Sequence, residues 1–87
     1  MKSYIVTINT RDGEYEYIDK TILELTDEQA ESPSEILSLW RGSDDKPDEV
    51  WATWFEFRGF DHRHYQVYYI QEIEADHVRI LRNYGIY

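Results

Sequence analysis

One short segment of the chain carries residues that could do chemistry, namely Asp61, His62, Arg63 and His64. A His-x-His pair beside a carboxylate can hold a divalent metal ion, because imidazole and carboxylate are common ligands. In an extended segment His62 and His64 would project to the same side. However, Arg63 would place a positive charge between the ligands, and His77 is the only other histidine. We therefore interpret this segment as a solvated hairpin tip and expect neither a metal site nor a cofactor.

A second candidate for chemistry is a pair of carboxylates in the aromatic segments, Glu56 and Glu72. Acid–base catalysis needs two groups whose environments separate their pKa values, and these two could approach each other across a strand ladder. They could equally lie on the solvent face of an antiparallel sheet, which is the more common arrangement. The chain has no cysteine nucleophile, and it has no glycine-rich phosphate loop and no serine elbow. We expect a protein that is not an enzyme.

The elements that would position these residues begin with the segment from Val50 to Ile73, which we predict to be one long β-hairpin. Its arms are 50–58 and 64–73, and both are rich in aromatic and β-branched residues, which favour strands. The turn at 59–63 lies between the arms. No other part of the chain could bury as much apolar area.

The N-terminal part predicts a second hairpin. Residues 3–10 alternate in the manner of a strand, Asp12-Gly13 favours a tight turn, and the return strand covers 14–25. The apolar parity of the return strand is interrupted near Asp19-Lys20. Either a bulge or bend at that point, or a strand covered on both faces, would explain the interruption.

Two helices are predicted. Ser32-Pro33 followed by Glu35 is typical of a helix start, so the main helix is placed at 33–41, after a short helical turn at 27–31. Trp40 is expected to be buried where this helix meets the sheet. A polar loop follows at 43–49. The segment 75–84 could be a strand or a helix by periodicity, and we predict a helix because acids stand at its start and arginines at its end.

These elements predict a small single α+β domain over residues 1–87. Its sheet is expected to be mainly antiparallel and four-stranded, with one or two short helices in the order ββα-ββα. The acidic half, 1–49, has 13 acids and 5 bases, and the aromatic half, 50–87, has 10 of the 14 aromatic residues.

The net charge of -9 bounds the function. An acidic surface repels the phosphates of nucleic acid and attracts basic proteins over a distance. The alternative interpretation is that the acidity only keeps a small protein soluble. No apolar run reaches the roughly 18 residues of a membrane span, and the first residues do not resemble a signal peptide, so we expect a cytoplasmic protein without membrane contact.

The leading hypothesis is a non-enzymatic, acidic protein-binding module. Its sharpest form is an inhibitor of a basic nucleic-acid-handling protein, a nucleic-acid mimic of the viral anti-defence type. The acids expected to bind the partner are Asp12, Glu14, Glu16, Asp44, Asp45, Asp48 and Glu49.

The alternative is a self-associating or accessory domain, including a homodimer, that uses an exposed aromatic sheet face with Trp54, Phe60 and Tyr68. A surface that stacks single-stranded nucleic acid on Tyr65 and Tyr68 is disfavoured, since the domain is strongly acidic and its arginines are scattered. No direct binding of nucleic acid is expected.

Overall fold

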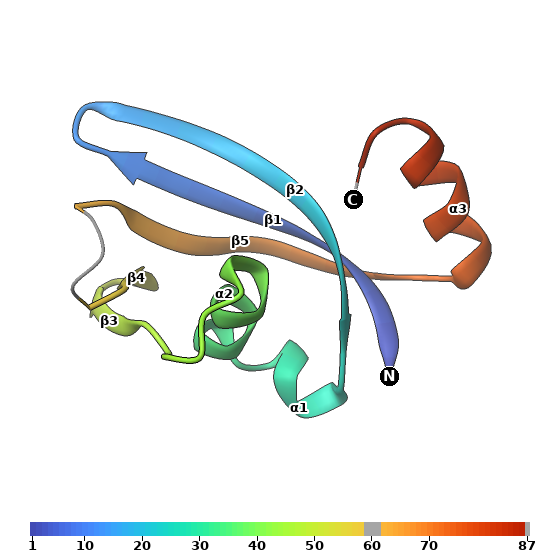
Figure 1. Ribbon diagram of the computed structural model, residues 1–87, viewed down its shortest axis with the longest axis horizontal. Coiled ribbons are helices and arrows are strands. Elements are labelled where there is room, and N and C mark those ends of the chain that lie inside the picture. The colour runs from blue at the N-terminus through green and yellow to red at the C-terminus, as the bar shows by residue number, and fades with distance from the viewer. Residues whose placement is uncertain (59–61, 87) are drawn as a thin grey trace.

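The computed structural model describes residues 1–58 and 62–86 (Figure 1). The chain is an α+β protein with one antiparallel five-stranded sheet, whose strands lie in the order β2-β1-β5-β4-β3. The strands are β1 (Lys2–Asp12), β2 (Tyr15–Leu25), β3 (Asp48–Trp51), β4 (Trp54–Glu56) and β5 (His64–Ile73). The helices are α1 (Asp27–Ala30), α2 (Pro33–Arg41) and α3 (Ala75–Asn83).

The prediction of four strands is wrong because the expected strand 50–58 is broken. Ala52 and Thr53 have positive φ angles of 32° and 70° and form a tight turn, so that Trp51 lies opposite Trp54. Residues with a Cβ rarely adopt this conformation, so the residue types Ala52 and Thr53 do not predict a turn from the sequence. The turn is supported by Glu49, whose Oε2 accepts a hydrogen bond from the Thr53 N–H at 3.3 Å. Asp48 and Glu49, predicted in a loop, belong to β3.

The first hairpin is confirmed, but neither of the two explanations for the interrupted parity near Asp19, a bulge or bend and a strand covered on both faces, holds. The β1–β2 register runs without a shift from Lys2 opposite Leu25 to Asp12 opposite Tyr15. The turn consists of Gly13 and Glu14, and Gly13 supplies the φ of 65° that such a turn requires. The parity of β2 fails for a different reason. The first six residues of β2 are exposed on both faces, so they have no apolar alternation to keep.

A bulge does occur in β5, where Thr7 lies opposite Tyr69 and Ile8 opposite Val67. Tyr68 is therefore an extra residue in the β1–β5 ladder. Because of this insertion, residues on both sides of it, such as Tyr65 and Ile70, reach the same face of the sheet.

One face of the sheet, which we call the covered face, packs against α1 and α2 (Figure 1). The core forms there from nine buried side chains: Tyr4, Val6, Ile8, Leu25, Ile36, Leu37, Phe55, Phe57 and Tyr65. Contrary to the prediction, Trp40 is only half-buried. Ile36 and Leu37 fill the space between α2 and the sheet, and Trp40 rests on the rim with its ring 5.5 Å from that of Tyr65, edge to face.

Helix α2 has the predicted bounds because its two ends carry strong local signals. The Ser32 hydroxyl accepts a hydrogen bond from the Glu35 N–H at 3.5 Å, Pro33 is the first helical residue, and Gly42 closes the helix with a φ of 71°. Helix α1 has a complete capping box between Thr26 and Gln29.

Helix α3 confirms the prediction at 75–84 within one residue. It lies on the opposite face of the sheet from α1 and α2, near Ile5 and Ile73, and none of its residues is buried. A groove of about 320 Å³ separates α3 from these strands. Among the described helices, none is both long and apolar enough to cross a lipid bilayer.

Candidate functional site

The face of the sheet opposite α1 and α2, which we call the open face, brings polar and aromatic side chains together in rows. The first row crosses all five strands. Pairing places Trp51 opposite Trp54, Trp54 opposite Gln66, Gln66 opposite Asn9, and Asn9 opposite Ile18. Directly opposed residues in antiparallel strands point to the same face. We call these five residues the tryptophan row.

The tryptophan row is held by ring stacking and by side-chain hydrogen bonds. The rings of Trp51 and Trp54 are stacked with their centroids 6.0 Å apart. Asn9 donates from Nδ2 to Oε1 of Gln66 at 3.1 Å, and Gln66 donates from Nε2 to Oγ1 of Thr53 at 2.6 Å. The row therefore has a fixed geometry rather than a set of independent surface side chains.

A second row, one step along the strands, carries charge. Asp48 lies opposite Glu56, His64 opposite Arg11, and Arg11 opposite Glu16. Within this charged row, His64 Nε2 lies 3.7 Å from Glu56 Oε2, and Arg11 donates from Nε to Glu16 Oε1 at 2.9 Å.

The two rows contact each other through Arg11 and His64. The Arg11 guanidinium carbon lies 5.2 Å from the centre of the Trp54 ring, and the His64 ring lies 4.8 Å from that of Trp51. A cation over an aromatic face is attractive, and it also fixes the orientation of the ring. The tryptophan row and the charged row thus form one surface.

His64 is the residue of this surface that the sequence analysis weighed as a metal ligand. His64 is half-buried, and its contacts are to Trp51 and Glu56 rather than to a nucleophile. Within residues 1–58 and 62–86, no group of three or more His, Cys, Asp or Glu side chains is placed to hold a metal ion. Asp61, the carboxylate of the metal-ligand pattern that the sequence analysis weighed and rejected, lies outside the described residues.

The suggested approach of Glu56 and Glu72 across the ladder does not occur. Glu72 lies opposite Tyr4 near the other end of β5, and its carboxylate is 3.7 Å from the Lys2 ammonium. The carboxylates of Asp27 and Glu72 raise the pKa of Lys2 above its usual value. Glu72 therefore pairs with Lys2 at one end of the sheet, whereas Glu56 lies beside His64 at the other end.

The predicted partner-binding acids are distributed over several elements, and four of them have partners. Asp12 pairs with Arg63 at 3.2 Å and Asp48 with Arg58 at 3.1 Å, in addition to the bonds of Glu16 and Glu49 described above. Glu14, Asp44 and Asp45 make no ion pair with any residue that the structure describes. Glu14 lies in the β1–β2 turn, and the two aspartates lie in the loop after α2.

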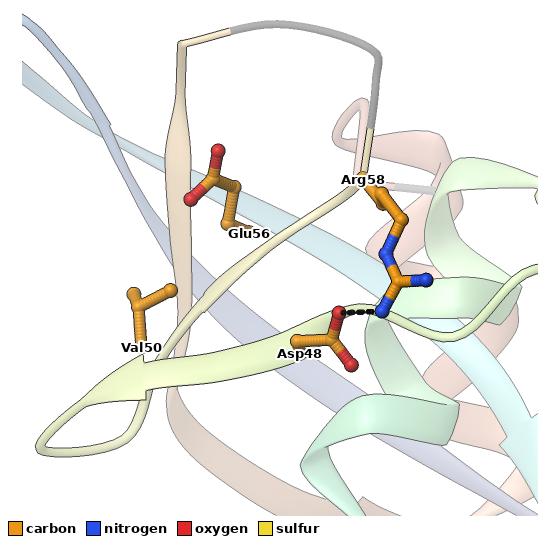
Figure 2. Close-up of a pocket in the computed structure, with 4 residues that line it drawn as sticks. All are labelled: Asp48, Val50, Glu56 and Arg58. Carbon is orange, nitrogen blue, oxygen red and sulfur yellow. Dashed lines mark hydrogen bonds and ion pairs between the residues drawn. The ribbon is translucent and has the colours of Figure 1, made fainter.

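A shallow pocket of about 260 Å³ lies beside β3 and β4 and is lined by Asp48, Val50, Glu56 and Arg58. Figure 2 shows the Arg58 side chain reaching back to Asp48, while the Glu56 carboxylate stays apart from that pair. A second hollow of about 280 Å³ shares Asp48 and Arg58 and adds Asp45 and Lys46. The two hollows are therefore lined by three carboxylates, by the cations Arg58 and Lys46, and by one apolar side chain, Val50.

Of the predicted aromatic residues, Trp54 lies half-buried in the tryptophan row, and Tyr68 is 60% exposed at the bulge. Phe60 lies outside the described residues. The sequence analysis assigned no site role to Trp51 or Arg11 and weighed His64 only as a metal ligand, because the meeting of these residues depends on the turn at 52–53 and on the pairing of distant strands. No protein-family model, curated protein or solved structure matches this chain.

Proposed function

We propose that this chain is a non-enzymatic protein-binding module that engages a basic partner through the open face. The observation that carries the proposal is the stacked pair of Trp51 and Trp54 beside the charged row, which contains the carboxylates of Asp48, Glu56 and Glu16. Asp48 and Glu56 lie toward one edge, and Glu16 lies toward the other. Aromatic anchors inside a polar rim are typical of protein–protein interfaces.

Charge supports a basic partner. The net charge is -9, and the carboxylates of Glu14, Asp44 and Asp45 are not neutralised by ion pairs with described residues. Long-range attraction of this kind speeds the encounter with a partner of opposite charge and aligns it before contact.

The pocket beside β3 suggests how a basic side chain would be received. Val50 could contact the methylene groups of a lysine or arginine, and Glu56 and Asp48 could bind its charged end. Asp48 would exchange its bond to Arg58 for the incoming cation. The sharpest form of the proposal is inhibition of a nucleic-acid-handling protein, in which these carboxylates occupy the places of phosphates.

A second candidate function is an accessory or self-associating domain that relies on aromatic contacts. It is favoured by the exposure of two neighbouring tyrosines, Tyr68 at 60% and Tyr69 at 58%. Large exposed aromatic side chains give much contact area for a small loss of entropy. In this function Trp54 and Tyr68 bind the partner, and the acids only keep the protein soluble.

The test begins by capturing partners from a host lysate at low and at high salt, and then measures binding kinetics with the captured protein. We expect the triple variant D44N/D45N/D48N and the double variant E14Q/E16Q to lower the on-rate and weaken its dependence on salt. Trp54→Ala should raise the off-rate. The two acidic variants test the contribution of the carboxylates, and Trp54→Ala tests the contribution of the stacked tryptophans.

A matched control removes the same charge elsewhere. Glu24 on β2, Glu28 on α1 and Glu31 directly after α1 are exposed and lie away from the open-face rows. The triple variant E24Q/E28Q/E31Q should bind normally. An equal loss of binding in this control would show that the acidic variants act through the net charge of the protein and not through the positions of their carboxylates. Normal binding of both acidic variants, with binding abolished by Trp54→Ala or Tyr68→Ala in a folded protein, would favour the second function.

Direct binding of nucleic acid is a separate question with a simple test. A labelled single-stranded oligonucleotide should not bind even at low salt, because the net charge of -9 repels the phosphate backbone. Measurable affinity that falls in Trp54→Ala would instead make the open face a base-stacking surface.

A further inference from the structure

Strand β2 forms a long edge of the sheet. It has 11 residues and, among the described strands, pairs only with β1, whereas the strand at the opposite edge, β3, has four. The first six residues of β2 are exposed. Figure 1 shows that the tip of the β1–β2 hairpin extends away from all three helices. An exposed edge of this kind is a template for another strand.

The turn determines which backbone groups this edge offers. In a two-residue hairpin, the residues that flank the turn exchange hydrogen bonds with each other, and pairs alternate from there. Asp12 and Tyr15 flank the turn. The backbone N–H and C=O groups of Glu16, Ile18 and Lys20 therefore point away from β1, toward the free side.

We propose that a second copy of this chain pairs antiparallel along the β2 edge, with the twofold axis at Ile18. In this register Glu16 lies opposite Lys20 of the second copy, and Lys20 lies opposite Glu16 of the second copy. Ile18, which is 61% exposed, meets its own counterpart at the axis. The edge is thus complementary to itself in both charge and backbone hydrogen bonding.

Neighbouring registers are less favourable. An axis at Asp19 or Lys20 would place identical charges directly opposite each other, which is destabilising. An axis at Tyr17 would set Glu16 against Ile18. The net charge of -9 opposes association of any two copies, but residues 15–21 contain two acids and one base, so this edge is one of the least repulsive parts of the N-terminal half.

The dimer is independent of the proposed function, yet it would affect the binding surface. A twofold axis perpendicular to the sheet joins the two sheets edge to edge and leaves both open faces on the same side. The open-face rows of the two copies would then be presented together, so a partner with two matching basic sites would be held by both.

The test uses sedimentation equilibrium on the full chain and a charge exchange. Lys20→Glu alone and Glu16→Lys alone each create two like-charge pairs in the symmetric dimer, and each should weaken it by about tenfold. A mixture of the two variants restores both opposite-charge pairs and should form a mixed dimer. Glu24→Lys is the control, because Glu24 lies on the same strand beyond the paired segment, and this variant should dimerise normally.

A second variant addresses the backbone. Ile18→Pro removes an outward N–H at the axis, which the edge of the folded monomer does not use, so circular dichroism should be unchanged while dimerisation is lost. The proposal is overturned if the wild-type chain stays monomeric near millimolar concentration. It is equally overturned if the dimer survives Ile18→Pro, or if the mixture of charge variants fails to associate.

Discussion

The two faces of the sheet are built from the same strands, yet alternate residues of those strands have opposite roles. On β1, Val6 and Ile8 have no exposed surface and pack under α2. Their neighbours Asn9 and Arg11 belong to the open-face rows. The comparison teaches that the period of two along a strand is enough to separate the core side chains from those of the open face, so substitutions on the two faces should have separable effects.

The largest expected effect comes from replacing a buried isoleucine on the covered face. An exposed isoleucine on the open face is replaced for comparison. Ile8→Ala removes a fully buried side chain and should lower the free energy of unfolding by about 2–5 kcal/mol. Ile18→Ala removes a side chain that is 61% exposed on the open face and should lower it by less than about 1 kcal/mol. Urea denaturation measures both. Equal losses would mean that the open face is also part of a core.

The next effect concerns Trp40, which lies at the rim of the covered face. Because it is half-buried, Trp40→Ala should lower the free energy of unfolding by about 2 kcal/mol, below the range of about 3–5 kcal/mol for a buried tryptophan. The same denaturation experiment tests this value. A loss below about 1 kcal/mol would mean that α2 is held by Ile36 and Leu37 without help from the rim.

A smaller effect, of opposite sign, is expected at Thr10. Its hydroxyl is buried on the covered face and has no hydrogen-bond partner among the described residues. Thr10→Val keeps the shape and removes the unpaired polar atom, so the free energy of unfolding should rise by about 1 kcal/mol. Thermal unfolding would detect the gain. A clear loss would show that the hydroxyl is bonded in solution.

The exposed acids should contribute less still. Neutralising Asp44, Asp45 and Asp48 together should change the free energy of unfolding by less than about 1 kcal/mol, since the one ion pair they make with described residues, Asp48 with Arg58, is exposed. Denaturation with and without added salt measures this. A larger loss would give the loop after α2 a structural role and would complicate its use as a binding probe.

No effect at all is expected from divalent metals. Calorimetry with zinc, nickel and manganese should detect no stoichiometric binding, because His64 is already engaged by Glu56 and Trp51. A one-to-one isotherm that is lost in His62→Ala or His64→Ala would contradict this expectation and make the hairpin tip a metal site.

The elements with strong local signals could be predicted from the sequence. The cap at Ser32-Pro33 and the glycine at position 42 set the bounds of α2, and Gly13 set the first turn. The break at Ala52-Thr53 could not be predicted, because residues with a Cβ adopt positive φ only when their surroundings impose it. That one turn changed the number of strands and placed Trp51 beside Trp54.

The candidate site was less predictable than the fold for the same physical reason. The acidic character follows from composition, but which acids are neutralised depends on contacts between distant segments, such as Asp12 with Arg63. The charged row needs the register of all five strands. Sequence periodicity specifies a face within one strand and does not align one strand with the next.

The central position of β1 also bears on how the chain folds. Strand β1 pairs with β2 through a two-residue turn, but its other side pairs with β5, and Asn9 and Gln66 are 57 positions apart. The first hairpin can form early and locally, whereas the centre of the sheet must wait for the last strand. During synthesis one backbone edge of β1 would therefore stay unpaired until most of the chain has emerged, and this interval is when the protein is most prone to aggregate.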